Sequence, residues 1–97
     1  MIFRQGDVLL SPAQQVEGTK LANLILAKGE LTGHAHRITE GLAELYESEG
    51  TLYLRVISET AWLTHEEHHP IEVPKGDWFV RIQREYTPAH RWHQVVD

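Results

Sequence analysis

The sequence predicts an all-β protein, a small single-domain β-barrel or sandwich that spans residues 1–97. Short apolar segments recur with turn-forming residues about every 8 to 12 positions, a spacing typical of small antiparallel β-domains. The clearest segment, residues 51–57, alternates apolar and polar side chains with the period of a strand. Residues 78–86 alternate in the same way. Together these patterns predict roughly seven to nine short antiparallel strands.

In the N-terminal half, a turn at Gly6-Asp7 precedes a short buried strand that Pro12 ends. The polar residues 13–20 predict a loop. Three further strands, each bounded by turn residues, are expected over residues 21–27, 34–38 and 42–47. The apolar run within residues 21–27 is also compatible with a short helix. Residues 48–50 then predict a hairpin turn into the next strand.

The alternation in residues 51–57 predicts which side chains face the core. Leu52, Leu54 and Val56 should point inward, and Tyr53 and Arg55 outward. In the C-terminal half we expect strands over residues 60–64, 71–73 and 78–86. A turn over residues 75–77 should separate the last two, which makes Asp77 a turn residue. The polar tail, residues 89–97, places His90 and His93 at the surface.

Composition excludes several classes of function. The 97 residues contain no cysteine, which rules out disulfides, cysteine–zinc sites and thiol nucleophiles and suits a cytoplasmic protein. No apolar run is long enough to span a bilayer, so no membrane contact is expected. The formal net charge is −5 and the basic residues are scattered. Nucleic-acid binding is therefore not expected either.

Seven histidines in three groups are the anomaly of this composition. The first group, His34-Ala35-His36, follows Gly29 and Gly33. In an extended strand, residues two apart point to the same face, so His34 and His36 could present two imidazoles side by side. Imidazole is the commonest protein ligand for Zn, Ni, Cu and Fe. The pattern therefore predicts either a metal site or an exposed histidine pair on a surface strand.

The spacing from Gly29 through His34-Ala35-His36 to Glu40 and Gly50 resembles the first motif of the cupin family. The gap after Gly29 is shorter than usual, and Gly50 comes later than usual. Cupins are small jelly-roll-like barrels, and the resemblance implies that His34, His36 and Glu40 bind a divalent metal ion, of which Zn, Ni, Fe and Mn are the candidates.

The second cupin motif is only partly present. Pro74-Lys75-Gly76 matches its Pro-x-Gly, but its histidine would fall near Phe79, which binds no metal. The missing ligand could come from the second histidine group, which consists of His65, His68 and His69. A solvated acidic loop is the other reading of that group. His65-Glu66-Glu67-His68-His69 also matches the HExxH zinc-protease motif, but that motif requires a helix, and Pro70 follows at once.

The segments RQGDVLL, GELTGHAHRI and VRIQREYTP together resemble small proteins of bacteria and their phages. This second resemblance covers most of the chain and implies no activity. It indicates only that the three segments belong to one kind of protein.

Two functions are compatible with these observations. The first is a cupin-like metalloprotein with a histidine-lined pocket that binds a small molecule or performs metal-assisted chemistry. The second is a non-catalytic β-domain that acts through protein contacts, as a homodimer or as an accessory to a larger partner, because edge strands need covering. The histidines would also suit pH sensing, since imidazoles titrate near neutrality.

Overall fold

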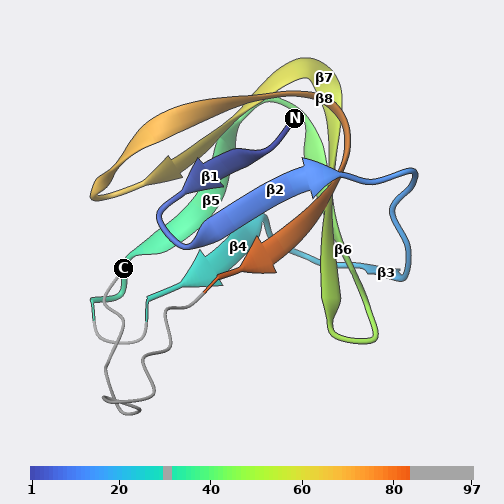
Figure 1. The fold of residues 1–97 in the computed structure, drawn as a ribbon, viewed down its shortest axis with the longest axis horizontal. Coiled ribbons are helices and arrows are strands. Elements are labelled where there is room, and N and C mark those ends of the chain that lie inside the picture. Colours follow the sequence, from blue (N-terminus) through green and yellow to red (C-terminus); the bar gives the residue numbers. More distant parts are fainter. Residues whose placement is uncertain (30–31, 84–97) are drawn as a thin grey trace.

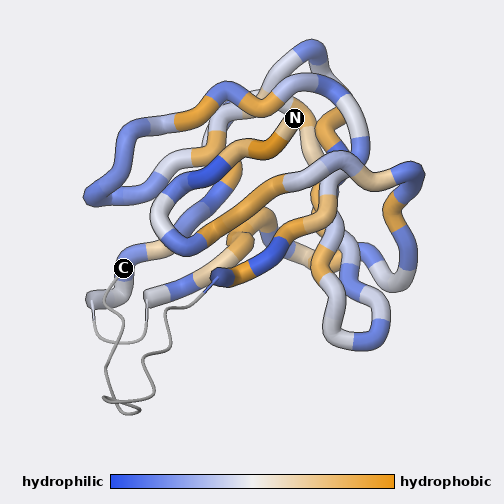
Figure 2. The backbone as a smooth tube through the Cα atoms, viewed as in Figure 1, coloured by the Kyte–Doolittle hydropathy of each residue, from blue (hydrophilic) through white to orange (hydrophobic). Residues whose placement is uncertain are grey.

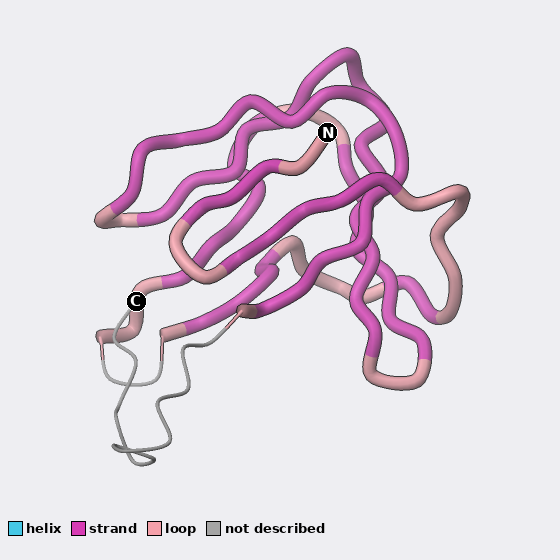
Figure 3. Tube along the Cα trace, in the orientation of Figure 1, coloured by secondary structure: helices cyan, strands magenta, loops and turns pink. Residues whose placement is uncertain are grey.

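The computed structural model describes residues 1–29 and 32–83, and this part of the chain consists of strands and loops without a helix (Figure 1; Figure 3). Its strands are β1 (Phe3–Gln5), β2 (Val8–Pro12), β3 (Thr19–Lys20), β4 (Ile25–Lys28), β5 (Ala35–Glu40), β6 (Ala43–Ser48), β7 (Thr51–His65) and β8 (His68–Ile82). All pairings among them are antiparallel. The all-β prediction is confirmed, and no helix that could cross a membrane is found among the described residues.

A long hairpin of β7 and β8, 15 residues each, forms the centre of the sheet. The main strand order is β1-β2-β8-β7-β5-β4, while β6 pairs with β7 and β3 pairs with β6. β7 changes partner along its length, because residues 51–56 pair with β6 and residues 62–64 pair with β5. The sheet therefore bends around β7 and curls into a half-barrel (Figure 1).

The hydrophobic core lines the inside of this curl. Val8, Leu10, Leu45 and Leu54 are completely buried there, and Trp78 covers them at 4% exposure. Figure 2 shows the complementary pattern, with hydrophilic residues at the far end of the β7–β8 hairpin. The core thus fixes the middle of the long hairpin and leaves its turn for polar side chains.

Several predicted strands are parts of longer ones. Residues 51–57 and 60–64 belong to β7, and residues 71–73 join the predicted last strand in β8. The predicted turn over residues 75–77 is wrong, because Gly76 pairs with Val56 inside the ladder. The register shifts between Val56 and Thr60, where Pro74 lies opposite, so the irregularity is a bulge rather than a chain reversal.

Three further expectations need correction. Asp77 is a strand residue that accepts a hydrogen bond from Arg55 Nε at 3.2 Å. Tyr53 points away from Leu54, as alternation requires, yet it is buried, because its ring packs against Phe79 at 5.3 Å between centroids. The predicted loop over residues 13–20 contains the short β3.

The predictions for β2, β5 and β6 agree with the structure apart from their ends. Of the strand predicted over residues 21–27, only residues 25–27 belong to β4, and β1 was not predicted. The turn before β7 uses Glu49 and Gly50, both with positive φ (48° and 82°), which suits a tight hairpin. The end of the predicted strand 78–86 and the tail residues 89–97, with His90 and His93, lie outside the described residues.

Replacement of Leu54 by alanine should lower the free energy of unfolding by about 2–5 kcal/mol, because it leaves a cavity at a completely buried position. Leu42→Ala is the matched control, since Leu42 is 65% exposed, and its effect should stay within about 0.5 kcal/mol. Urea denaturation measures both values. Equal effects would contradict the assignment of the core.

Candidate metal centre

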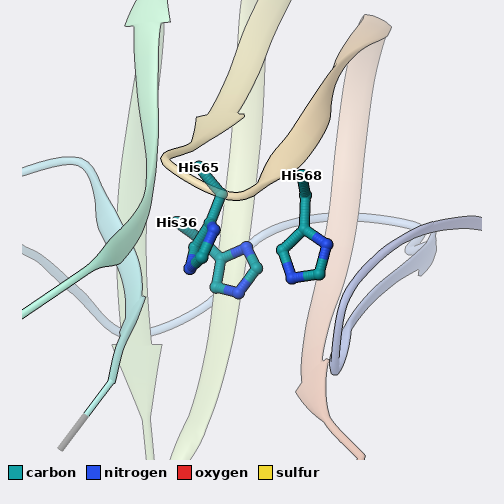
Figure 4. A group of neighbouring side chains, drawn as sticks. All are labelled: His36, His65 and His68. Carbon is teal, nitrogen blue, oxygen red and sulfur yellow. The ribbon is translucent and has the colours of Figure 1, made fainter. Parts of the chain in front are cut away.

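Three imidazole rings from three strands converge beside the turn of the β7–β8 hairpin (Figure 4). His65 ends β7 and lies opposite His68, the first residue of β8, because a two-residue turn joins the strands. His36 comes from β5, whose next residue, Arg37, pairs with Thr64 of β7. The backbone register thus places all three rings together.

The distances within this inner group suit a single cation. One ligand atom from each of His36, His65 and His68 lies within 4.8 Å of the other two. The ring centroids of His36 and His65 are 4.2 Å apart, and those of His65 and His68 are 4.6 Å apart. His36 and His65 are buried, and His68 is half-buried. Zinc binds imidazole nitrogen at about 2.0–2.1 Å, so a small inward movement of the rings would bring them to a shared ion.

The side chain of Gln5 fixes the protonation of His36. The Gln5 Nε2 amide donates to the backbone carbonyls of Leu63 and His69, at 2.9 Å each. Its Oε1 must therefore be the acceptor for His36 Nδ1, 2.8 Å away. His36 consequently carries a proton on Nδ1 and directs Nε2 toward the group, as metal-binding histidines usually do.

The carboxylate of Asp7 lies beside the same ring. Asp7 Oδ1 is 3.5 Å from His36 Nε2, and the two side chains are 12% and 2% exposed. When the ring is neutral, the Nε2 lone pair faces a carboxylate oxygen, and these two groups repel each other. A proton or a cation between them turns this repulsion into attraction.

The β1–β2 turn closes this side of the inner group. Gly6 has φ of +60°, and a Cβ at this position would lie 2.7 Å from His68 Nε2. Only glycine lets the backbone approach the ring so closely. The turn is held from outside by the backbone N–H of Gln83, which donates to the Asp7 carbonyl at 2.7 Å.

The remaining ring nitrogens differ in their surroundings. The Glu67 N–H donates to His65 Nδ1 at 3.0 Å, so neutral His65 carries its proton on Nε2. Binding of an ion at Nε2 would require that proton to move to Nδ1 and the Glu67 contact to break. Nε2 of His65 and of His68 are buried and have no hydrogen-bond partner among the described residues. Such atoms are costly to bury unless something else satisfies them.

An outer group shares His65 with the inner one. Ligand atoms of His34, His65 and Glu66 also lie within 4.8 Å of one another. The Ala35 N–H donates to Glu66 Oε1 at 3.0 Å, and this bond is the main reason why the pKa of that carboxyl is below its ordinary value. The Glu66 backbone N–H and the charge of Arg37, 3.8 Å away, act in the same direction. Glu66 is therefore anionic throughout the neutral range.

The structure separates the ligands that the sequence places together. His34 and His36 do not share a strand face, because β5 begins at Ala35 and His34 precedes it; His34 belongs to the outer group and His36 to the inner one. Glu40 is exposed at the other end of β5, about 13 Å from His36 at strand spacing. His69 is also exposed, and neither group among the described residues includes it or Glu40.

The HExxH reading requires a helix, which this segment does not form. Glu66 and Glu67 make the turn of the hairpin, and His65 and His69 lie on different strands. Gln5 and Asp7 are parts of the arrangement that sequence reasoning missed. Their only signal is the turn motif Gln5-Gly6-Asp7, which predicts a chain reversal and says nothing of its neighbours.

The family described as a domain of unknown function (DUF8820) matches residues 4–83, which include both groups. No curated protein and no solved structure matches the chain.

Gln5→Leu should destabilise the fold by at least about 1–3 kcal/mol, because it leaves two carbonyls and the His36 Nδ1–H without their buried partner. The exposed Gln14, changed to leucine, is the control and should have little effect. Urea denaturation measures stability, and two-bond ¹H–¹⁵N spectra report the ring proton. A wild-type spectrum with His36 unprotonated at Nδ1 would contradict this assignment.

Proposed function

We propose the function of this chain from the residues of its candidate metal centre, because the family to which the chain belongs is described as a domain of unknown function (DUF8820). The protein binds one divalent transition-metal ion through the imidazoles of the inner group, His36, His65 and His68. The observation that carries the proposal is the convergence of three poorly exposed rings in which two Nε2 atoms lack a hydrogen-bond partner among the described residues. A bound cation would satisfy His68 Nε2, and it would satisfy His65 Nε2 once the proton of that ring has moved to Nδ1.

The kind of metal follows from the donor atoms. Imidazole suits Zn²⁺, Ni²⁺ and Fe²⁺, whereas Mg²⁺ and Ca²⁺ prefer sites made of oxygen. The chain has no cysteine to attract soft ions. Asp7 would add one negative charge next to His36 and offset part of the charge of the cation. We therefore propose Zn²⁺, Ni²⁺ or Fe²⁺ before Mn²⁺.

Three histidines leave one position of a tetrahedral ion for a water molecule or a small ligand. An ion held in this way polarises oxygen and lowers the pKa of bound water, which supports metal-assisted chemistry on a small molecule. This proposal keeps the metal expected from the cupin resemblance, with a different ligand set. His36 is common to both sets, and His65 and His68 are candidates for the missing ligand, whereas Glu40 lies far along β5.

The alternative function, a protein-interaction module, is favoured by the ends of the sheet. β1 and β4 are the terminal strands of its main path, and each pairs with one neighbour among the described residues. A second copy of the chain could pair with either edge. This second candidate predicts a homodimer in the cytoplasm. Light scattering coupled to size exclusion tests it, and a monomer at all concentrations would contradict it.

His68→Ala should abolish stoichiometric metal binding, with a loss of affinity of about 100-fold or more, since even the loss of a residue that only orients a metal ligand costs about 10–100-fold. His69→Ala is the matched control, because the neighbouring side chain is exposed and Gln5 uses only its carbonyl. Metal content by plasma mass spectrometry and calorimetric titration with Zn²⁺ measure both variants.

A stabilising effect of the metal provides a second readout. Excess Zn²⁺ should raise the unfolding temperature of the wild type and of His69→Ala, but not that of His68→Ala, because an ion that binds only the folded state stabilises it. Wild-type protein that takes up no metal after reconstitution would refute the proposed function. Equal binding by both variants would remove His68 from the site.

A further inference from the structure

The inner group has one covered side and one accessible side. On the covered side, the β1–β2 turn lies against His68, so closely that a Cβ on Gly6 would clash with the ring. The Asp7 backbone is tied to Gln83, and Gln5 is only 2% exposed. A hydrated cation therefore does not reach the rings past this turn without opening the hairpin.

The accessible side is occupied by the outer group. The side chains of His34 and Glu66 are 28% and 41% exposed, in contrast to 2% for His36. Glu67 adds a second carboxylate, with Oε1 3.6 Å from His34 Nδ1. An open pocket of about 210 Å³ lies beside His65 and Glu66, on the face of β5 that carries Arg37 and is opposite to His36. Acidic side chains and an imidazole thus stand where a cation from solvent would arrive.

His65 connects the two groups. Its ring contacts His34 edge to face at 5.6 Å and His36 at 4.2 Å between centroids. His65 is only 7% exposed, and its Nε2 has no hydrogen-bond partner among the described residues. Because the Glu67 N–H is donated to Nδ1, only Nε2 is left for either group, and it can bind an ion once its proton moves to Nδ1 and the Glu67 contact breaks.

We propose that the outer group of His34, Glu66 and His65 is a loading site, which captures a divalent cation from solvent and passes it through His65 to the inner group. This inference rests on the proposed function. It assigns Glu66 and His34 to the path of the ion and not to its final coordination. A shared ligand permits such a transfer, since the ion keeps one bond while it exchanges the others.

The loading role has a kinetic signature. A residue that acts only on the path changes the association and dissociation rates by the same factor and leaves the dissociation constant unchanged. Glu66→Gln should slow Zn²⁺ association by about tenfold, within the range that electrostatic focusing contributes to on-rates. His34→Ala should slow it as well, because it removes a ligand atom of the outer group. Dissociation into excess chelator should slow by the same factor.

The experiment is stopped-flow mixing of apo protein with Zn²⁺ in the presence of a chromophoric chelator, together with equilibrium titration of each variant. Glu72→Gln is the matched control, because it removes the same charge from an exposed position on β8 outside both groups. Its rates should equal those of the wild type. Varying the salt concentration then separates general attraction from local capture.

The outcomes separate this inference from the function on which it rests. Wild-type protein that binds no Zn²⁺ refutes the proposed function itself. Zn²⁺ binding with rates in Glu66→Gln equal to those in Glu72→Gln overturns the loading site and leaves the function standing. A weaker equilibrium affinity in His34→Ala or Glu66→Gln, or two ions per chain, also overturns it, because the outer group would then hold an ion permanently.

Discussion

The hydrogen bonds of the Gln5 amide are the constraint on which the arrangement of this protein depends. One side chain from β1 bonds to the backbone of β7, to the backbone of β8 and to a ring on β5. Two fixed carbonyls leave the amide a single orientation, and that orientation sets the proton of His36. The Gln5 side chain therefore holds the strands together beside the hairpin turn and also sets the protonation of His36. A core residue that is only apolar could not link them in this way.

The inner group also shows how a small domain positions polar side chains at a buried place. The core fills the middle of the β7–β8 hairpin, so its turn extends beyond the apolar contacts. The space beneath that turn is taken by imidazoles rather than by leucines. Gly6 and Asp7 cover it from the N-terminal hairpin. Burial without full hydrogen bonding is costly, so this region gives up stability where the proposed ion would bind.

The sequence was informative where chemistry follows from local pattern. Alternation and turn residues predict an all-β chain. The first two histidine groups mark the segments that contribute His36, His65 and His68 to the candidate metal centre. The pattern predicted a turn near Pro74 and Gly76, but both residues pair with β7, and the ladder shifts register between them at a bulge. The spacing also suggested that Glu40 lies beside His36, whereas four residues of an extended strand separate the two by about 13 Å. Gln5 and Asp7 could not be found, because their partners lie far along the chain and only the strand pairing brings them together.

That distance along the chain has a consequence for the order of folding. The bonds from Gln5 to Leu63 and His69 join residues 58 and 64 positions apart, and the bond to His36 spans 31. Contacts of such high sequence separation form late, after the local hairpins. The three rings are thus assembled by a nearly complete sheet and do not nucleate it. A cation would bind the finished structure and prolong its lifetime, and the speed of folding would stay a property of the polypeptide alone.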